Sequence, residues 1–211
     1  MIILAAEQNT NMRSNTCIVI QGPATYYDHL KTVWSSHIQD VVFSTWVGEE
    51  SYFNESDQVI FSTTPKYPGV ANLNYQVKST LEGILWAESR GYERVLKMRS
   101  DMVPTNVDKF TSMFESFYLW TFALVPHEDI YFTDYFMCGD IHDMKRVWSI
   151  EAEGTWRYPE QAITNNIKSH CIEKARTCAH LVNSDNDVYS LKWNTYCSSY
   201  LPHWGYNISH R

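Results

Sequence analysis

Val95-Leu96-Lys97-Met98-Arg99-Ser100-Asp101 is the stretch that decides the fold, because a mostly apolar run passes directly into a base, a hydroxyl and a carboxylate. Parallel strands that helices cover on both faces read as near-continuous apolar runs. In open α/β sheets, ligands bind just beyond the carboxyl ends of such strands. The stretch therefore predicts a buried strand with Asp101 beside a ligand. An alternative stays open here: Ser100 and Asp101 are ordinary turn formers, and a turn before Pro104 would explain both.

Three earlier segments repeat the pattern of an apolar run that ends in polar residues. They are Cys17–Ile20, Val41–Trp46 and Val59–Ser62, and Gln21-Gly22-Pro23 follows the first of them. Helical periodicity over 26–38, 72–90 and 107–117, and a further buried strand over 118–125, complete the alternation. Such alternation predicts an α/β protein with a mostly parallel sheet. The sequence holds neither Gly-x-Gly-x-x-Gly nor Gly-Lys-Ser/Thr, so dinucleotide oxidoreductases and P-loop kinases lose their usual support.

The helix expected over 72–90 carries two stripes. Its apolar residues recur at helical spacing and are Leu73, Val77, Leu81, Ile84 and Leu85. A second stripe of uncharged residues consists of Asn72, Gln76, Ser79 and Gly83. A helix face in water usually carries more charge, so we expect this stripe to face a ligand cleft. A plain solvated face is the alternative.

Composition limits the functional classes. The 211 residues carry a net charge of −7, and 44% of them are apolar, as in an ordinary globular domain. A nucleic-acid partner is not expected, because it requires a clustered basic surface. Five scattered cysteines are typical of reduced intracellular thiols, and the start of the chain is too short and lacks the basic flank for a signal peptide or membrane span. We therefore expect one domain over 1–211, located in the cytoplasm.

The second half holds the remaining carboxylates of interest. Asp134 and Asp140 lie in the aromatic strand expected over 130–140, and Glu160 follows Pro159 at a helix start. A carboxylate in an apolar setting is costly without a partner, so Asp134 and Asp140 rank ahead of Glu160 as functional groups. Helix-dipole stabilisation alone would explain Glu160.

Several of these motifs together carry a resemblance. They are Ser44-Thr45-Trp46, Asn72 with Gln76 and Ser79-Thr80, Leu96–Asp101, Asp134–Asp140 and Pro159-Glu160-Gln161. With these motifs the chain resembles the WavE-type lipopolysaccharide-synthesis proteins, and especially the glycosyltransferase domains encoded by chlorella viruses. The resemblance implies a GT-A fold with helices on both faces of the sheet, a UDP-sugar donor, a glycan or glycoprotein acceptor and Mn²⁺ or Mg²⁺. In the viral case it also implies the N-terminal domain of a longer protein in the host cytoplasm.

The resemblance also implies roles at the expected metal site. Asp101 is the expected metal ligand, since a divalent cation stabilises the charge of a leaving diphosphate. GT-A enzymes usually carry Asp-x-Asp at this strand end, whereas Arg99 occupies the first position here. Arg99 is therefore expected to bind a phosphate, and His203 or His210 is the candidate for a further metal ligand.

The other expected roles concern the acceptor and the nucleoside. An inverting transferase needs a carboxylate base, for which Asp140, Asp134 and Glu160 are the candidates. Residues expected to bind the donor are Gln21, Gly22, Pro23, Thr45, Trp46, Asn72, Gln76, Ser79, Arg99 and Ser100. A carbohydrate-binding domain without catalysis, and a degenerate transferase that binds nucleotide without turnover, are the rival classes. The donor sugar, acceptor, stereochemistry and oligomeric state stay open.

Overall fold

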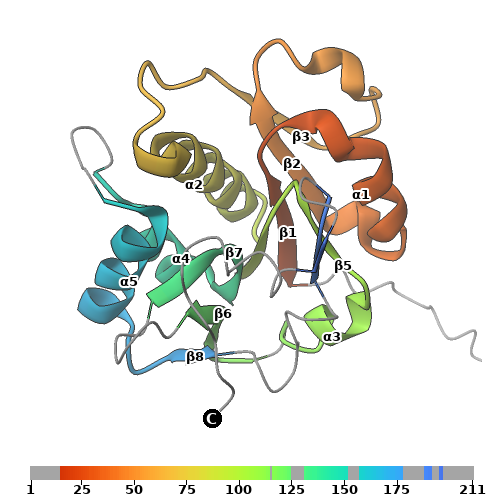
Figure 1. Ribbon diagram of the computed structural model, residues 1–211. Helices are drawn as coiled ribbons and strands as arrows, with labels where there is room; N and C mark the ends of the chain where they lie inside the picture. The colour runs from red at the N-terminus through yellow and green to blue at the C-terminus, as the bar shows by residue number, and fades with distance from the viewer. Residues whose placement is uncertain are drawn as a thin grey trace, which may run out of the picture.

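A seven-stranded sheet runs through the computed structural model, which describes residues 15–114, 116–124, 131–151, 157–177, 188–191 and 195–196 (Figure 1). The strand order is β3-β2-β1-β4-β7-β6-β8. These strands are β1 (Thr16–Gln21), β2 (Val41–Trp46), β3 (Val59–Ser62), β4 (Arg94–Arg99), β6 (Leu119–Leu124), β7 (Tyr131–Asp140) and β8 (Ala175–Thr177). Strand β7 is antiparallel to both β4 and β6, and the other pairs are parallel. The predicted mostly parallel sheet is confirmed.

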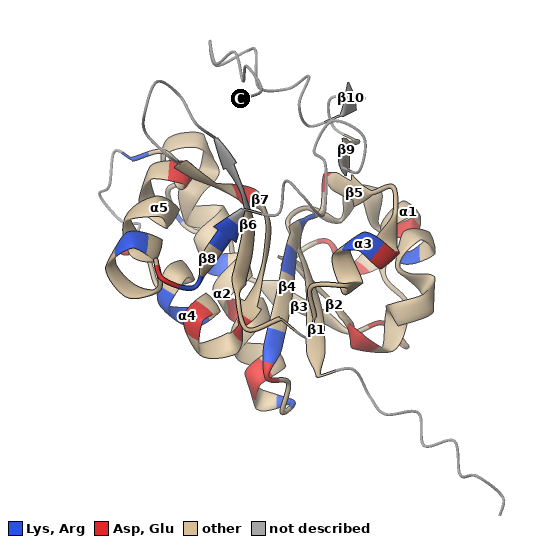
Figure 2. Ribbon diagram, turned by 90° about the horizontal axis from the view of Figure 1, so that it is seen from below, with Lys and Arg blue, Asp and Glu red and all other residues tan. Residues whose placement is uncertain are grey.

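Helices cover both faces of this sheet (Figure 1 and Figure 2). On one side lie α2 (Leu73–Ser89), α4 (Ile141–Trp148) and α5 (Pro159–His170), and on the other lie α1 (Tyr27–Val33) and α3 (Val107–Thr111). Because side chains alternate along a strand, Ile18 and Ile20 face one hydrophobic core, and Cys17 and Val19 face another. The first core includes α1 and residues of and just beyond α3; the second includes α2, α4 and α5. The predicted architecture, a mostly parallel sheet between two layers of helices, is therefore confirmed.

Several short elements connect these layers. They are the 3-10 helices η1 (Ala24–Tyr26), η2 (Ser35–Asp40), η3 (Glu50–Tyr52) and η4 (Val70–Asn72), and the second sheet formed by β5 (Met102–Pro104), β9 (Val188–Ser190) and β10 (Thr195–Tyr196). The helix predicted over 26–38 is thus divided between η1, α1 and η2. Within the described ranges, none of the helices is long and apolar enough to cross a membrane.

The uncharged stripe of α2 faces the sheet. Ser79 is fully buried and its carbonyl accepts a hydrogen bond of 2.6 Å from the Ser44 hydroxyl. A Cβ at Gly83 would lie 2.4 Å from Cγ1 of Val19, so the glycine permits close packing. Leu85, expected in the core, is instead 42% exposed. Ser79 and Gly83 therefore pack on the sheet and face neither a ligand cleft, as predicted, nor water. Gln76 is buried as well, whereas Asn72 is exposed.

Candidate functional site

The loop after β1 meets the end of β4 at the carboxyl edge of the parallel strands. The Ser100 amide donates to the Gln21 carbonyl at 2.7 Å, and the Gly22 amide donates to the Ser44 carbonyl at 3.1 Å. Gly22 has a φ of +126°, and a Cβ there would lie 2.6 Å from Oγ of Ser100. Only glycine fits this backbone and this contact. Gln21, Gly22 and Ser100 are therefore brought together as predicted, while Pro23 is exposed beside them.

Glu49 holds the neighbouring strand end in place. The Thr45 hydroxyl donates to the Glu49 carboxylate, which also accepts from the Ala24 amide at 3.1 Å. Trp46 is buried and its ring lies 5.2 Å from that of Tyr75. Thr45 and Trp46, both expected to bind the nucleoside, thus have structural partners. Nothing in the sequence motifs indicated the role of Glu49.

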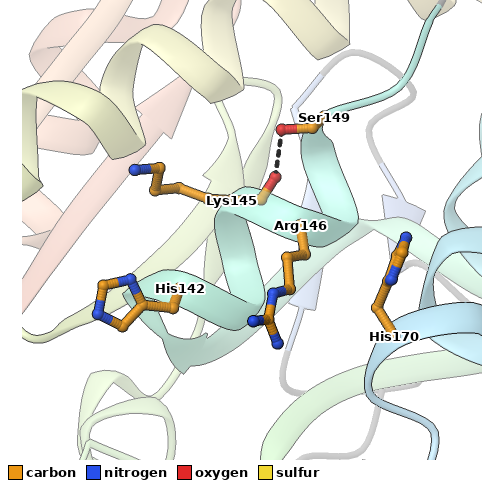
Figure 3. A pocket seen from close by; sticks show the side chains of 5 residues that line it. All are labelled: His142, Lys145, Arg146, Ser149 and His170. Atoms are coloured by element: carbon orange, nitrogen blue, oxygen red, sulfur yellow. Dashed lines mark hydrogen bonds between the residues drawn. The ribbon is translucent and has the colours of Figure 1, made fainter.

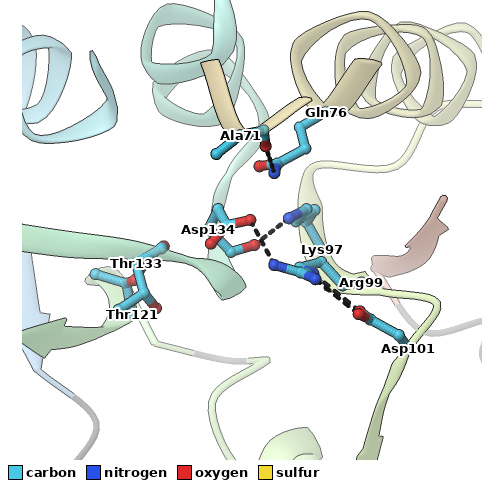
Figure 4. Close-up of polar contacts among 8 residues, drawn as sticks. All are labelled: Ala71, Gln76, Lys97, Arg99, Asp101, Thr121, Thr133 and Asp134. Carbon is cyan, nitrogen blue, oxygen red and sulfur yellow. Dashed lines mark hydrogen bonds and ion pairs between the residues drawn. The ribbon is translucent and has the colours of Figure 1, made fainter. Parts of the chain in front are cut away.

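Arg99, the last residue of β4, joins two carboxylates (Figure 4). Its Nε and Nη2 donate to the two carboxylate oxygens of Asp101 at 2.9 and 2.7 Å, and its Nη1 donates to Oδ2 of Asp134 at 3.1 Å. The guanidinium also lies 5.3 Å from the ring centre of Tyr135. Burial alone would lower the pKa of Arg99, but Asp134 and Asp101 outweigh it and raise that pKa. The guanidinium is held in its charged form between two anions.

Lys97 lies in the centre of the sheet, on β4 and two residues before Arg99. Its ammonium is fully buried, donates to the backbone carbonyl of Asp134 and lies 4.6 Å from the ring centre of Trp148. Burial lowers the pKa of Lys97 to about 7, against the opposing charge of Asp134. The sequence motifs assign no role to Lys97, although a lone charge inside the apolar run Val95–Met98 is a signal.

Several buried oxygens in this region accept no hydrogen bond from the described residues. They include Oδ1 of Asp134, Oε1 of Gln76 and Oε1 of Gln21. Gln76 donates to the Ala71 carbonyl at 3.2 Å and its side chain lies over Asp134 and Lys97 in Figure 4. Because unsatisfied buried acceptors are costly, they favour a ligand that supplies donors such as hydroxyls.

The backbone above Gln76 has an uncommon conformation. Ala71 and Asn72 have φ values of 48° and 63°, in the left-handed region that non-glycine residues seldom occupy. Such residues concentrate at ligand sites, where the surrounding structure holds them in place. Asn72 therefore shapes the start of α2 next to the predicted ligand site.

Glu160 approaches the same place from the first turn of α5. This helix packs along β7 and contacts η4. Burial raises the pKa of the half-buried Glu160 carboxyl to about 7, and the negative charge of Asp134 adds to that rise. We call Lys97, Arg99, Asp101, Asp134 and Glu160 the strand-end cluster. It is a set of coupled charges in which one carboxyl titrates near neutral pH.

Asp140 lies at the opposite end of β7. It pairs with Arg94 at the start of β4, about 20 Å along the strand from Asp134. Its carboxylate accepts from the amides of His142 and Asp143 at 2.9 and 3.4 Å, as the N-cap of α4. The structure therefore does not bring Asp140 into the strand-end cluster. The hydrogen bonds of the N-cap offset the cost of placing this carboxylate in an aromatic strand.

The expected metal ligands fit a cation only in part. Both carboxylate oxygens of Asp101 are already bonded to Arg99. Among the residues that the structure describes, no group of three or more His, Cys, Asp or Glu side chains could hold a metal ion. His203 and His210 lie outside the described residues. The described side chains thus do not form a cation site without a rearrangement of Arg99.

Comparison with known proteins shows only a remote similarity of fold. No family model matches the chain, and no curated protein matches it. Among solved structures, the fold is similar to the crystal structure of a mannose-1-phosphate geranyltransferase from Thermus thermophilus, at 8% identity and a TM-score of 0.47, over 77% of this chain and 73% of that one. This likeness is too remote to assign an activity.

Proposed function

We propose that this protein is a glycosyltransferase that moves a sugar from a UDP-sugar to a hydroxyl of a glycan acceptor. The observation that carries the proposal is the strand-end cluster, which lies where ligands bind in open α/β sheets. It combines a carboxyl whose pKa burial raises to about 7, a second carboxylate with one oxygen that accepts no hydrogen bond from the described residues, the Arg99 guanidinium and the buried Lys97 amine. The resemblance of the sequence motifs to viral glycosyltransferase domains supplies the class of reaction.

Glu160 is the proposed general base. A base works best when its pKa lies near the working pH, and the pKa of Glu160 is about 7. The acceptor hydroxyl gives its proton to Glu160 while its oxygen bonds to the sugar C1. The bond from C1 to the diphosphate breaks, and UDP leaves with that electron pair. Asp134 raises the basicity of Glu160 through its charge and is the proposed positioning carboxylate.

Arg99 and the unpaired oxygens of Gln76 and Asp134 are the groups proposed to bind the UDP-sugar. Arg99 is the proposed diphosphate ligand, because guanidinium groups bind phosphates, as they do carboxylates, through paired hydrogen bonds. This binding would replace its present pair with Asp101. The unpaired oxygens of Gln76 and Asp134 would accept from sugar hydroxyls. Binding of Mn²⁺ or Mg²⁺ at Asp101 would require Arg99 to release the Asp101 carboxylate.

A degenerate transferase, which binds nucleotide without turnover, is the second candidate. It is favoured by the bidentate pair between Arg99 and Asp101, which occupies the carboxylate that a metal would need. Nucleotide binding without sugar transfer or donor hydrolysis would identify this case.

Calorimetry and a hydrolysis screen test the proposal together. UDP is titrated into the protein with and without Mn²⁺, and a panel of nucleotide sugars is then screened for slow donor hydrolysis. We expect UDP to bind and one donor to be hydrolysed, with Glu160→Gln slowing hydrolysis by about 10²- to 10⁴-fold. Glu55→Gln is the matched control, since Glu55 is exposed and distant in sequence from every member of the cluster. Absence of nucleotide binding under both conditions would overturn the proposal.

A further inference from the structure

A second concave site lies on the exposed face of α4, away from the strand-end cluster. It has a volume of about 400 Å³ and is lined by His142, Lys145, Arg146, Ser149 and His170 (Figure 3). We call it the α4 pocket. The first four residues follow the i, i+3, i+4, i+7 spacing of one helix face, and His170 ends α5. Because α4 follows Asp140, the pocket belongs to the end of the sheet opposite Asp101. The volume is within the range of small-molecule sites.

Helix packing fixes the walls of the α4 pocket. The Asn166 side chain on α5 donates to the carbonyls of Arg146 and Val147 at 3.3 and 3.0 Å. These bonds tie the end of α4 to the middle of α5, so the two walls keep their relative position. Arg146 extends between His142 and His170 in Figure 3. The pocket is therefore formed before any ligand arrives.

The charges next to the α4 pocket leave Arg146 available. Lys145 is paired with both carboxylate oxygens of Glu88 at 2.8 Å. Asp143 is buried and pairs with Lys174 at 2.7 Å, whereas its distance to Arg146 is 4.0 Å. The Arg146 side chain is 62% exposed. Its guanidinium thus has only one distant anion among the described residues and keeps most of its capacity to donate hydrogen bonds.

The chemistry of the lining selects an anion. Each of the five side chains is a cation, an imidazole or a hydroxyl, although the protein has a net charge of −7. Basic residues near helix C-termini stabilise the helix dipole, and this alone could explain the last turns of α4 and α5. The dipole does not explain why such residues from two helices converge on one cavity. A phosphate matches the planar donor fork of arginine and accepts from imidazoles as well.

We propose that the α4 pocket binds the phosphate group of a small phosphorylated compound, with Arg146 as the principal ligand and His142 and His170 as flanking donors. Capture of the phosphate would replace the 4.0 Å contact with Asp143 by direct charge-assisted hydrogen bonds. The site is separate from the proposed transferase site and does not depend on its activity.

Titration with inorganic phosphate, pyrophosphate and a hexose phosphate at constant ionic strength tests this site. Calorimetry gives the affinity, and the histidine ring resonances, assigned with His142→Gln and His170→Gln, report the location by NMR. We expect saturable binding that shifts both rings and that Arg146→Gln weakens about tenfold or more. Arg90→Gln is the matched control, because Arg90 is exposed and stacks on Trp86 at 5.2 Å outside the pocket. Circular dichroism checks that each variant folds.

Four results would overturn the proposal. They are no saturable binding by the wild-type protein, binding that leaves the two rings unshifted, binding that Arg146→Gln leaves unchanged, and an equal loss in Arg90→Gln, which would indicate bulk charge only. Cosedimentation with phosphatidylglycerol vesicles separates a lipid headgroup from a soluble ligand. Binding to vesicles without binding of the soluble phosphates would contradict the small-molecule site.

Discussion

Strand β7 carries two aspartates, Asp134 in its first half and Asp140 as its last residue, but their surroundings differ. Asp134 is buried, pairs with Arg99, and has one oxygen without a partner among the described residues. Asp140 lies at the other end of the strand and caps α4 through two backbone amides. The residue type and the strand are the same, and both positions have aromatic or apolar neighbours in sequence. The difference lies in what the sheet brings to each end.

This comparison shows how a carboxylate is assigned to chemistry or to structure. The amides of α4 satisfy Asp140 locally, so its position is explained without a ligand. Arg99 from β4 pairs with the Asp134 carboxylate, and the charge of Asp134 adds to the raised pKa of Glu160 on α5. Three elements that are distant in the sequence therefore converge at the Asp134 end, as expected for a ligand site.

The largest effect should follow removal of the arginine that pairs with Asp134. Arg99→Met leaves Asp134 and Asp101 without their shared cation, and we expect the free energy of unfolding to fall by about 3–5 kcal/mol. Arg146→Met, at the Asp140 end, removes an exposed side chain 4.0 Å from its acid and should cost about 0–1 kcal/mol. Urea denaturation in buffer without phosphate measures both. Equal losses would mean that the buried ion pairs have no special importance.

Two glycines, Gly22 near the strand-end cluster and Gly139 next to Asp140, allow effects on stability to be separated from effects on binding. A Cβ at Gly22 would lie 2.6 Å from Oγ of Ser100, and one at Gly139 would lie 2.6 Å from Cδ1 of Leu119. We expect Gly22→Ala and Gly139→Ala each to destabilise the fold by about 1–3 kcal/mol. Only Gly22→Ala should also weaken UDP binding, because it displaces the loop at the strand-end cluster. Calorimetry with UDP on the two folded variants measures this. Weaker UDP binding by Gly139→Ala alone would contradict the assignment of the binding site to the strand-end cluster.

The capping role of Asp140 predicts a smaller effect. Asp140→Ala should lower the free energy of unfolding by about 1 kcal/mol, since the first amides of α4 lose their acceptor. Asparagine caps nearly as well, so Asp140→Asn should keep most of that stability. Thermal denaturation of the pair measures the difference. A loss of the same size in both variants would show that the negative charge, rather than capping, is what matters.

The Asp134 end should also give stability a pH dependence through Glu160. The folded pKa of about 7 lies above the ordinary 4.5, so the folded state holds the proton more tightly. Stability from this group is complete below pH 4.5 and is lost as the pH rises towards 7. Glu160→Gln should flatten that slope, as measured by denaturation at several pH values below about 7, where Lys97 contributes little change. If Glu160→Gln left the pH dependence of the free energy of unfolding unchanged, the raised pKa of Glu160 would be contradicted.

Much of the fold could be predicted from the sequence, because local patterns specify it. The apolar runs at 17–20, 41–46 and 95–98 form β1, β2 and β4, and helical periodicity predicted α2. The antiparallel direction of β7 could not be predicted, since no local signal tells which way a buried strand pairs. Helix α4 was missed, although Asp140 and the following acid at Asp143 form an ordinary helix start.

The site could be predicted in part. The strand end at Arg99–Asp101 and the loop Gln21-Gly22 were expected to lie together, and their backbones are hydrogen-bonded through Gln21 and Ser100. Asp134 and Asp140 could not be ranked from the sequence, because only the antiparallel pairing of β7 with β4 shows that Asp134 is the one near the carboxyl end of β4. Glu160 ranked too low, since its burial beside Asp134 depends on how α5 packs on β7.

Donor hydrolysis by two matched variants tests the central claim, that the strand-end cluster is the catalytic site. The substrate is the UDP-sugar that the wild-type protein hydrolyses, and the variants are Asp134→Asn and Asp140→Asn, both checked for folding. We expect Asp134→Asn to lower the hydrolysis rate by about a hundredfold or more, and Asp140→Asn to keep the wild-type rate. An Asp134→Asn variant with wild-type activity, or an equal loss in Asp140→Asn, would contradict this claim.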